Sequence, residues 1–162
     1  MRILVIRHAK AGRREPWSYT DSARHLAPDG LTQAQELADL LGSVKFTALF
    51  SSPYPRCLET LEPLRRKLGL EVKPDERLAE TTTLVALESF LMGLEEEGVY
   101  AVCSHGNVVP AIVELLVGRQ VLALPEPILS SKGSVWDVEI DRGTVRSVVF
   151  KEPEMKREYR YR

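Results

Sequence analysis

Three predominantly apolar runs, each ending in polar residues and each followed by a helical pattern, most constrain how this chain folds. The runs are Ile3–Ile6, Phe46–Phe50 and Val99–Cys103. Short runs of this kind are typical of strands buried inside a sheet. Their alternation with helices predicts an α/β fold with a mostly parallel central sheet.

The helical segments are predicted from apolar residues that recur every three or four positions and from residues that suit helix ends. They begin at Pro28, Pro53, Leu84 and Val108 and close at Gly42, Gly69, Gly98 and Gly118. Ser52 and Thr83 have side chains that can cap the second and third helices. Ala27 precedes the first helix without such a side chain, so we expect a weaker start there.

The last third of the chain predicts an antiparallel hairpin. Residues 135–140 and 144–150 have strand composition, and Asp141-Arg142-Gly143 supplies the turn between them. The 162 residues fit one domain. We expect that domain to span residues 1–150, with residues 151–162 as a charged, partly disordered tail.

Polar side chains follow the predicted strands at their carboxyl ends. Arg7 and His8 follow the first strand, Arg56 lies just after the second, and His105 follows the third. Taken singly, His8 could merely end a strand and either arginine could face water. Because the carboxyl ends of parallel strands meet at one edge of a sheet, the four side chains together predict an anion site.

These residue types suit phosphoryl transfer. A histidine of ordinary pKa, ~6.5, is largely neutral at pH 7 and can attack phosphorus. Arg7, Arg56 and a protonated His105 would neutralise the phosphoryl oxygens. A carboxylic acid would protonate the leaving oxygen, and Glu80, between small and apolar neighbours, is the acid we single out. The scheme needs no metal and no cofactor.

Other polar residues near the expected site are candidates for substrate binding. Lys10, Arg13 and Arg14, followed by Arg24, belong to a polar segment that we expect to be a long loop, and they either line the anion pocket or are solvated. Lys10, Arg13 and Asn107 are our candidate substrate-binding residues.

Several other classes of function are disfavoured by the sequence. No Walker loop is present, and Cys57 and Cys103 each lack the arginine six residues on that a cysteine phosphatase needs. A formal charge of -1 gives no sign of nucleic-acid binding. No run is long enough to span a membrane, and two cysteines make no disulfide framework, so we expect a cytoplasmic protein.

The motifs resemble those of the histidine phosphatase superfamily, also called phosphoglycerate mutase-like. Arg7-His8 corresponds to the family's Arg-His-Gly signature, with Ala9 in place of glycine. Three further segments match in order: Leu26–Ala34, Ser51-Ser52-Pro53 with Arg56, and Ser104-His105-Gly106. The resemblance implies a three-layer α/β/α sandwich, His8 as the phosphorylated nucleophile, a phosphate pocket of Arg7, Arg56 and His105, and Glu80 at the position of the acid.

The short chain is similar to the SixA-type phosphohistidine phosphatases. Residues 7–12 and 131–136 are also similar to the phosphatase-like domain fused to some bacterial nudix hydrolases. We therefore expect a metal-independent phosphatase acting on a phosphohistidine protein or a small phosphoester. The alternatives are a non-catalytic phosphate-binding module and, less favoured without substrate-enclosing insertions, a mutase. Substrate choice would rest on the loops at 10–20 and 125–132.

Overall fold

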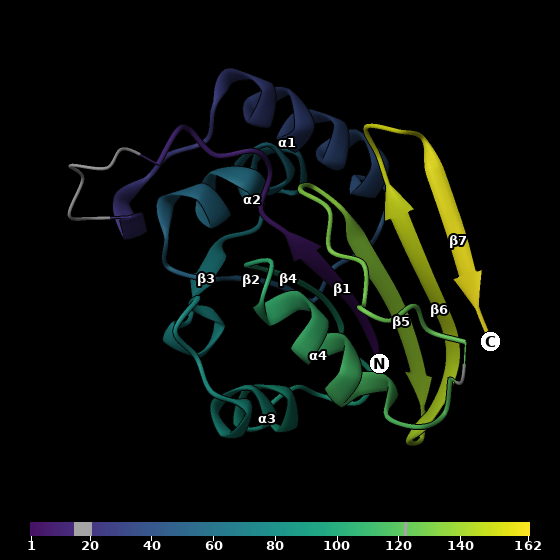
Figure 1. The fold of residues 1–162 in the computed structure, drawn as a ribbon. Helices are drawn as coiled ribbons and strands as arrows, with labels where there is room; N and C mark the ends of the chain where they lie inside the picture. The colour runs from purple at the N-terminus through teal and green to yellow at the C-terminus, as the bar shows by residue number, and fades with distance from the viewer. Residues whose placement is uncertain (15–20, 122) are drawn as a thin grey trace.

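The computed structural model describes residues 1–14, 21–121 and 123–162, and within them a single sheet carries helices on both faces (Figure 1). The strands are β1 (Arg2–Arg7), β2 (Ala48–Ser51), β3 (Val72–Pro74), β4 (Val99–Ser104), β5 (Val135–Asp141), β6 (Thr144–Glu152) and β7 (Arg157–Tyr161). The α-helices are α1 (Pro28–Leu41), α2 (Pro55–Leu68), α3 (Leu84–Met92) and α4 (Val108–Val117). Two short 3-10 helices are η1 (Asp21–Ala23) and η2 (Glu76–Leu78).

The sheet order is β3-β2-β4-β1-β5-β6-β7. The pairs β3–β2, β2–β4 and β4–β1 are parallel, whereas β5, β6 and β7 run antiparallel to their neighbours. This arrangement confirms the predicted α/β class and the C-terminal hairpin.

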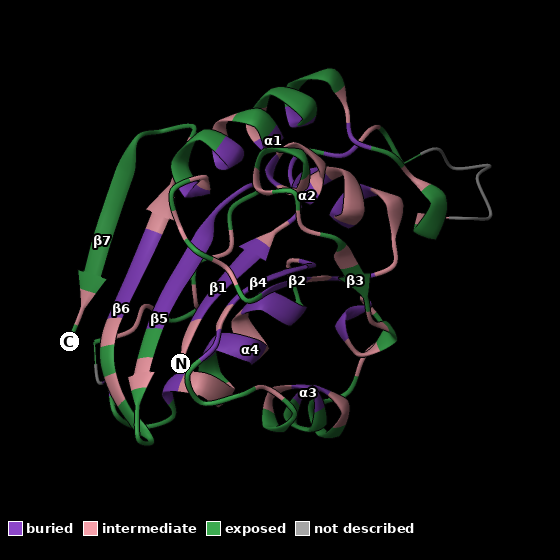
Figure 2. Ribbon diagram, turned by 180° about the vertical axis from the view of Figure 1, so that it is seen from behind, coloured by how far each residue is buried: buried purple, intermediate pink, exposed green. Residues whose placement is uncertain are grey.

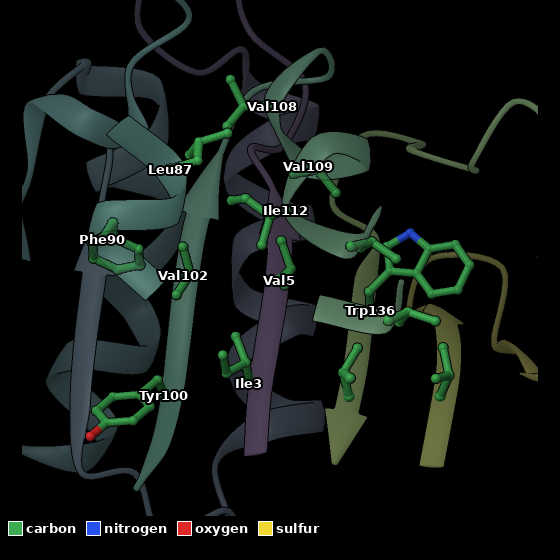
Figure 3. Packing of buried hydrophobic residues seen from close by; sticks show 14 of the residues in the cluster. Ile3, Val5, Leu87, Phe90, Tyr100, Val102, Val108, Val109, Ile112 and Trp136 are labelled. Atoms are coloured by element: carbon green, nitrogen blue, oxygen red, sulfur yellow. The ribbon is translucent and has the colours of Figure 1, made fainter. Parts of the chain in front are cut away.

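Strand β1 lies at the centre of the sheet and is buried on both faces. Ile3 and Val5 belong to the cluster that α3 and α4 cover, drawn in Figure 3. Leu4 and Ile6 belong to the opposite cluster, which α1 and α2 cover. Helices therefore form a layer on each side of the sheet, as Figure 2 shows by the buried strands between them. This is the expected three-layer α/β/α sandwich.

Helix α2 begins two residues later than predicted. Pro55, not Pro53, occupies its first turn, and Tyr54 precedes it without a side-chain cap. Ser52 does accept a backbone N–H, that of Tyr54 at 3.3 Å, but its hydroxyl also contacts a histidine described below. A proline at either position suits a helix start, so the sequence could not choose between them.

Helix α3 also ends earlier than predicted, at Met92, with Gly93 as its cap, although Thr83 caps its start as expected. Gly98 does not stop the helix but closes a turn, donating its N–H to Glu95 at 3.1 Å. A Cβ on Gly98 would lie 2.2 Å from the ring of Tyr100. The glycine is needed because an aromatic ring packs against its backbone.

The expectation of a partly disordered tail is wrong for residues 157–161. They form β7, whose residues pair with β6 from Val148 to Glu152. The ring of Tyr161 lies 5.4 Å from that of Trp136. The boundary predicted at residue 150 therefore falls inside β6, and the division into one domain and a tail stays a prediction that the strand pairing disfavours.

Part of the loop expected after His8 lies outside the described residues, namely 15–20. Of the part that is described, Ala11 forms an isolated bridge with Leu26, which draws this segment back towards α1. Among the described residues, no helix has the length and apolarity that crossing a membrane requires.

Candidate active site

The strand register brings the predicted polar tips together. Arg7 of β1 lies opposite Ser104 of β4, and Ser51 of β2 lies opposite Cys103. The pairing continues one step beyond the strands, where the N–H of His8 donates to Ser104 at 3.0 Å. His8 and His105 consequently lie at one edge of the sheet, with ring centroids 5.5 Å apart.

A cavity of about 430 Å³ opens at this edge. Its lining includes most of the predicted site residues and several others, namely Arg7, His8, Ala11, Arg14, Arg24, Arg56, Glu80, Gly106, Asn107 and Lys132. Among the predicted catalytic residues, the buried His105 is not part of this lining. Lys10 and Arg13 are also absent from it: Lys10 extends outward to Asp29 at 3.4 Å, and Arg13 is exposed. The structure thus brings Asn107 to the cavity but not these two candidates.

His8 is held with one nitrogen engaged and the other available. Its Nδ1 lies 2.7 Å from the carbonyl oxygen of Ala9. A carbonyl can only accept, so Nδ1 carries the proton and Nε2 carries the lone pair. Burial, assisted by Arg56 and Arg7, lowers the pKa of His8 to about 4 against the opposing effect of the bond to Ala9. The imidazole is therefore neutral at pH 7 and can act as a nucleophile.

Arg56 is fully buried and fixed by several contacts, its side chain being 1% exposed. Nη1 donates to the backbone oxygen of Asp21 at 2.8 Å, and Nη2 donates to Glu80 at 3.1 Å. Its Cζ lies 5.0 Å from the centre of the Tyr54 ring. Its Nε is buried and, among the described residues, has no hydrogen-bond partner. Such an unsatisfied buried donor is costly unless a ligand accepts it.

His105 lies against this arginine. Nη2 of Arg56 is 3.4 Å from Nδ1 of His105, while Nε2 of His105 is 2.8 Å from Oγ of Ser52. A guanidinium only donates, so Nδ1 accepts and Nε2 donates to the serine. Burial, with Arg56 and His8, lowers the pKa of His105 to about 3. His105 is therefore neutral in the ligand-free site, and its protonation beside a phosphoryl group stays a prediction.

Arg7 is placed by the loop before β5 and by a glycine. Its Nη1 donates to the backbone oxygen of Ser130, and its Nε is buried with no hydrogen-bond partner in the described part of the chain. A Cβ on Gly106 would lie 2.7 Å from Cζ of Arg7. Gly106 therefore leaves the space that the guanidinium occupies.

Glu80 and Asn107 are joined to each other at the cavity wall. Asn107 donates from Nδ2 to the backbone oxygen of Glu80 at 2.9 Å. The carboxylate of Glu80, 38% exposed, reaches Arg56 rather than either histidine. Glu80 therefore lies in the cavity as expected, with a hydrogen-bond role that the sequence did not indicate.

Two residues that hold the site together were missed by sequence reasoning. Thr60 accepts the N–H of Ala9 at 3.0 Å and donates to the backbone oxygen of Arg56 at 2.7 Å, so it links the loop after β1 to α2. The carboxylate of Asp21 contacts Arg14, Arg24 and Arg56 at 3.1, 3.2 and 3.4 Å. Against the effect of burial, these arginines hold the pKa of Asp21 below its ordinary value.

Neither residue carried a sequence signal, because the contacts that matter, Thr60 with Ala9 and Asp21 with Arg56, join segments far apart in the chain. In the described residues, no cluster of three or more histidine, cysteine or acidic side chains is arranged to hold a metal ion. The arrangement is two neutral histidines beside two arginines that each have a buried, unsatisfied donor. It can bind an oxyanion and bring a nitrogen lone pair against it.

Replacing Gly106 with alanine should weaken anion binding without unfolding the protein. The new Cβ would displace the flexible end of Arg7, and losing one charge-assisted hydrogen bond, about 1.5–3 kcal/mol, predicts a roughly tenfold to hundredfold loss of affinity for inorganic phosphate. Calorimetric titration measures the affinity and thermal unfolding checks the fold. Gly93→Ala is the matched control, since its Cβ would meet nothing closer than 3.5 Å. Unchanged phosphate affinity in Gly106→Ala would exclude Arg7 from the anion site.

Comparison with known proteins agrees with this geometry. A family model described as "Histidine phosphatase superfamily (branch 1)" matches residues 3–89, more than half of the chain. The 8-oxo-(d)GTP phosphatase of Mycolicibacterium smegmatis is 30% identical over 145 residues, 87% of this chain and 45% of that protein. A second relative, the transcription factor tau 55 kDa subunit of Saccharomyces cerevisiae, is 38% identical over 68 residues, 41% of this chain and 16% of that protein. The chain thus spans less than half the length of these curated relatives.

Solved structures share the fold at lower identity. The protein histidine phosphatase SixA in complex with tungstate has a TM-score of 0.74 at 21% identity, covering 94% of this chain and 95% of that one. A SixA protein from Agrobacterium tumefaciens has a TM-score of 0.79 at 22% identity, covering 94% and 97%. The α-ribazole phosphatase of Shigella flexneri has a TM-score of 0.71 at 17% identity, covering 90% and 93%. The family match and the fold together establish that this chain belongs to the histidine phosphatase superfamily.

Proposed function

We propose that the chain is a metal-independent phosphatase that works through a phosphohistidine on His8. The observation that carries the proposal is the bond from Nδ1 of His8 to Ala9, 2.7 Å. It leaves Nε2 with a lone pair in a cavity whose two arginines, Arg7 and Arg56, have buried donors without partners in the described residues. A neutral nucleophile beside preorganised cations is the arrangement that phosphoryl transfer requires.

In the first step, Nε2 of His8 attacks phosphorus and the bond from phosphorus to the leaving oxygen breaks. Arg7 and Arg56 neutralise the negative charge on the equatorial oxygens. A bound phosphoryl dianion also brings negative charge beside His105, which raises the pKa of that histidine from its low value in the empty site. His105 would then be protonated by the binding of its ligand and donate to it from Nδ1.

In the second step, water attacks the phosphorus of phospho-His8. The nitrogen–phosphorus bond breaks, its electron pair returns to Nε2, and inorganic phosphate leaves. Glu80 lines the cavity and is the candidate that protonates an alkoxide leaving group and then deprotonates the water. The histidine of a phosphohistidine substrate is a better leaving group than an alkoxide, so its displacement has little need of that acid.

The substrate is a phosphohistidine protein or a small phosphoester. The name of the SixA structure supports the first class and that of the 8-oxo-(d)GTP phosphatase supports the second. A mutase is less favoured, because the described residues include no insertion that encloses a substrate. A non-catalytic phosphate-binding module remains the alternative, and the tau 55 kDa subunit of a transcription factor is a relative whose name describes no enzyme.

Substituting His8 with alanine should abolish turnover. We expect wild type to hydrolyse p-nitrophenyl phosphate and to form an acid-labile phosphate adduct on His8, and His8→Ala to lose activity by roughly a thousandfold or more. The test is a screen of phosphate compounds, including a phosphohistidine protein, with mass spectrometry at neutral pH. His25→Ala is the control, since that side chain is 71% exposed. Full activity in His8→Ala overturns the mechanism, and absence of any adduct with every compound favours the binding module.

Glu80→Gln should separate the two substrate classes. Loss of a general acid lowers kcat by about 10²–10⁴ on alkyl phosphates, whereas hydrolysis of a phosphohistidine protein should persist. Steady-state kinetics on both substrates measures the ratio. Glu76→Gln, an exposed residue outside the cavity lining, is the matched control. An equal fall on both substrates would instead mean that Glu80 acts only by holding Arg56.

A further inference from the structure

The cavity holds more positive charge than the transfer of one phosphoryl group uses. Arg14, Arg24 and Lys132 line it together with Arg7 and Arg56, and Glu80 is the one carboxylate among the described lining residues. We propose that Arg14, Arg24 and Lys132 form a second anion subsite, which takes a second phosphate linked directly to the one transferred. The proposal rests on the proposed function and narrows its substrate to small molecules with a phosphoanhydride bond.

The size of the cavity allows a second group. About 430 Å³ lies within the range of sites that enclose whole small ligands. One phosphoryl dianion at Arg7 and Arg56 would leave Arg14 and Arg24 sharing the single carboxylate of Asp21, so the outer part of the cavity would keep a net positive charge. Like charges around one cavity are unfavourable unless a ligand neutralises them. A second phosphate supplies that charge.

Asp21 sets the outer arginines beside the inner one. Its Oδ1 accepts from Arg14 at 3.1 Å and from Arg24 at 3.2 Å, while its Oδ2 accepts from Arg56 at 3.4 Å. One carboxylate therefore bridges the two groups of cations, which places their guanidinium groups within the reach of adjacent phosphates. Arg24 is fixed further by a bond from Nη1 to Gly12 at 2.8 Å, and its side chain is only 21% exposed.

Lys132 reaches the cavity from a different segment. Its neighbour Gly133 donates its N–H to the backbone oxygens of Arg7 and His8, at 3.2 and 3.3 Å. The segment is thus anchored on the tip of β1 and is independent of Asp21. A change at Lys132 tests the subsite without releasing Arg56.

The chemistry of an anhydride fits the groups present. Nε2 of His8 forms a bond to the terminal phosphorus, and the bond from that phosphorus to the bridging oxygen breaks. The bridging oxygen leaves with the electron pair as part of the second phosphate, which the outer cations neutralise. Water then releases the phosphate from His8. This leaving group needs no proton. The step therefore does not require an acid from Glu80, whose carboxylate contacts Arg56.

Calorimetric binding of inorganic pyrophosphate and inorganic phosphate to the full chain tests the subsite. We expect wild type to bind pyrophosphate at least tenfold more tightly than phosphate. Lys132→Gln should reduce that ratio about tenfold while phosphate binding changes less than twofold, and Arg14→Gln should also weaken pyrophosphate binding. Arg146→Gln, 58% exposed in β6 and outside the cavity lining, controls for the lost charge. Equal affinities in wild type, or an equal fall for both ligands in the variants, overturns the proposal.

Turnover separates this proposal from the proposed function. We expect wild type to hydrolyse pyrophosphate with phosphate trapped on His8, and Lys132→Gln to raise KM for pyrophosphate about tenfold with KM for p-nitrophenyl phosphate unchanged. If Lys132→Gln lowered hydrolysis of a phosphohistidine protein as much as hydrolysis of pyrophosphate, the outer cations would attract any anion. That result overturns the proposed subsite and leaves the proposed phosphatase activity standing. Tight pyrophosphate binding with no adduct on His8 retains the subsite and refutes the phosphatase.

Discussion

The hydrogen bond from Nδ1 of His8 to the carbonyl oxygen of Ala9 decides which nitrogen of the ring can react. It fixes the proton on one side of the imidazole and leaves the lone pair on the other. Ala9 is held in turn by Thr60, whose hydroxyl also bonds the backbone of Arg56. His8, the proposed nucleophile, and Arg56, the proposed phosphate-binding cation, are thus parts of one hydrogen-bonded unit, which lies at the end of the central strand of the sheet.

Burial and positive charge together determine the protonation state of the two histidines. Burial, together with the arginines that would bind a phosphoryl group, lowers the pKa of both histidines and keeps them unprotonated in the empty site. In that state the carboxylates of Asp21 and Glu80 are the partners of Arg56. A phosphate therefore enters a site in which its cations are already oriented. In the proposed mechanism, the phosphate replaces the carboxylate contacts of Arg56 with its own and supplies the negative charge that protonates His105.

Local sequence patterns were sufficient to predict the central sheet and the polar residues that follow its strands. Strand β1 has four consecutive apolar residues, and parallel neighbours must end at one edge, so the chain order alone was enough to bring His8, Arg56 and His105 together. The ends of helices and the C-terminal strand were harder to predict from the sequence. Pro53 and Pro55 suit a helix start equally well, and the pairing of β7 depends on a partner strand that its own charged sequence does not reveal.

The contacts of single side chains lay beyond sequence reasoning. Asp21 has no local feature to mark it, yet it bonds three arginines that come from three different segments. On charge alone, Lys10 and Arg13 were as plausible as cavity residues as Arg14 and Arg24. In the structure the segment folds back at the bridge between Ala11 and Leu26, and only Arg14 and Arg24 line the cavity.

The proposed mechanism depends most directly on the protonation state of His8. Nitrogen-15 NMR of the imidazole ring, recorded as a function of pH on the ligand-free protein, measures both the tautomer and the titration. We predict a neutral ring with its proton on Nδ1 at pH 6 and a midpoint near the pKa of about 4 that burial and the arginines produce. A proton on Nε2, or a midpoint at or above the ordinary value of ~6.5, would contradict the mechanism.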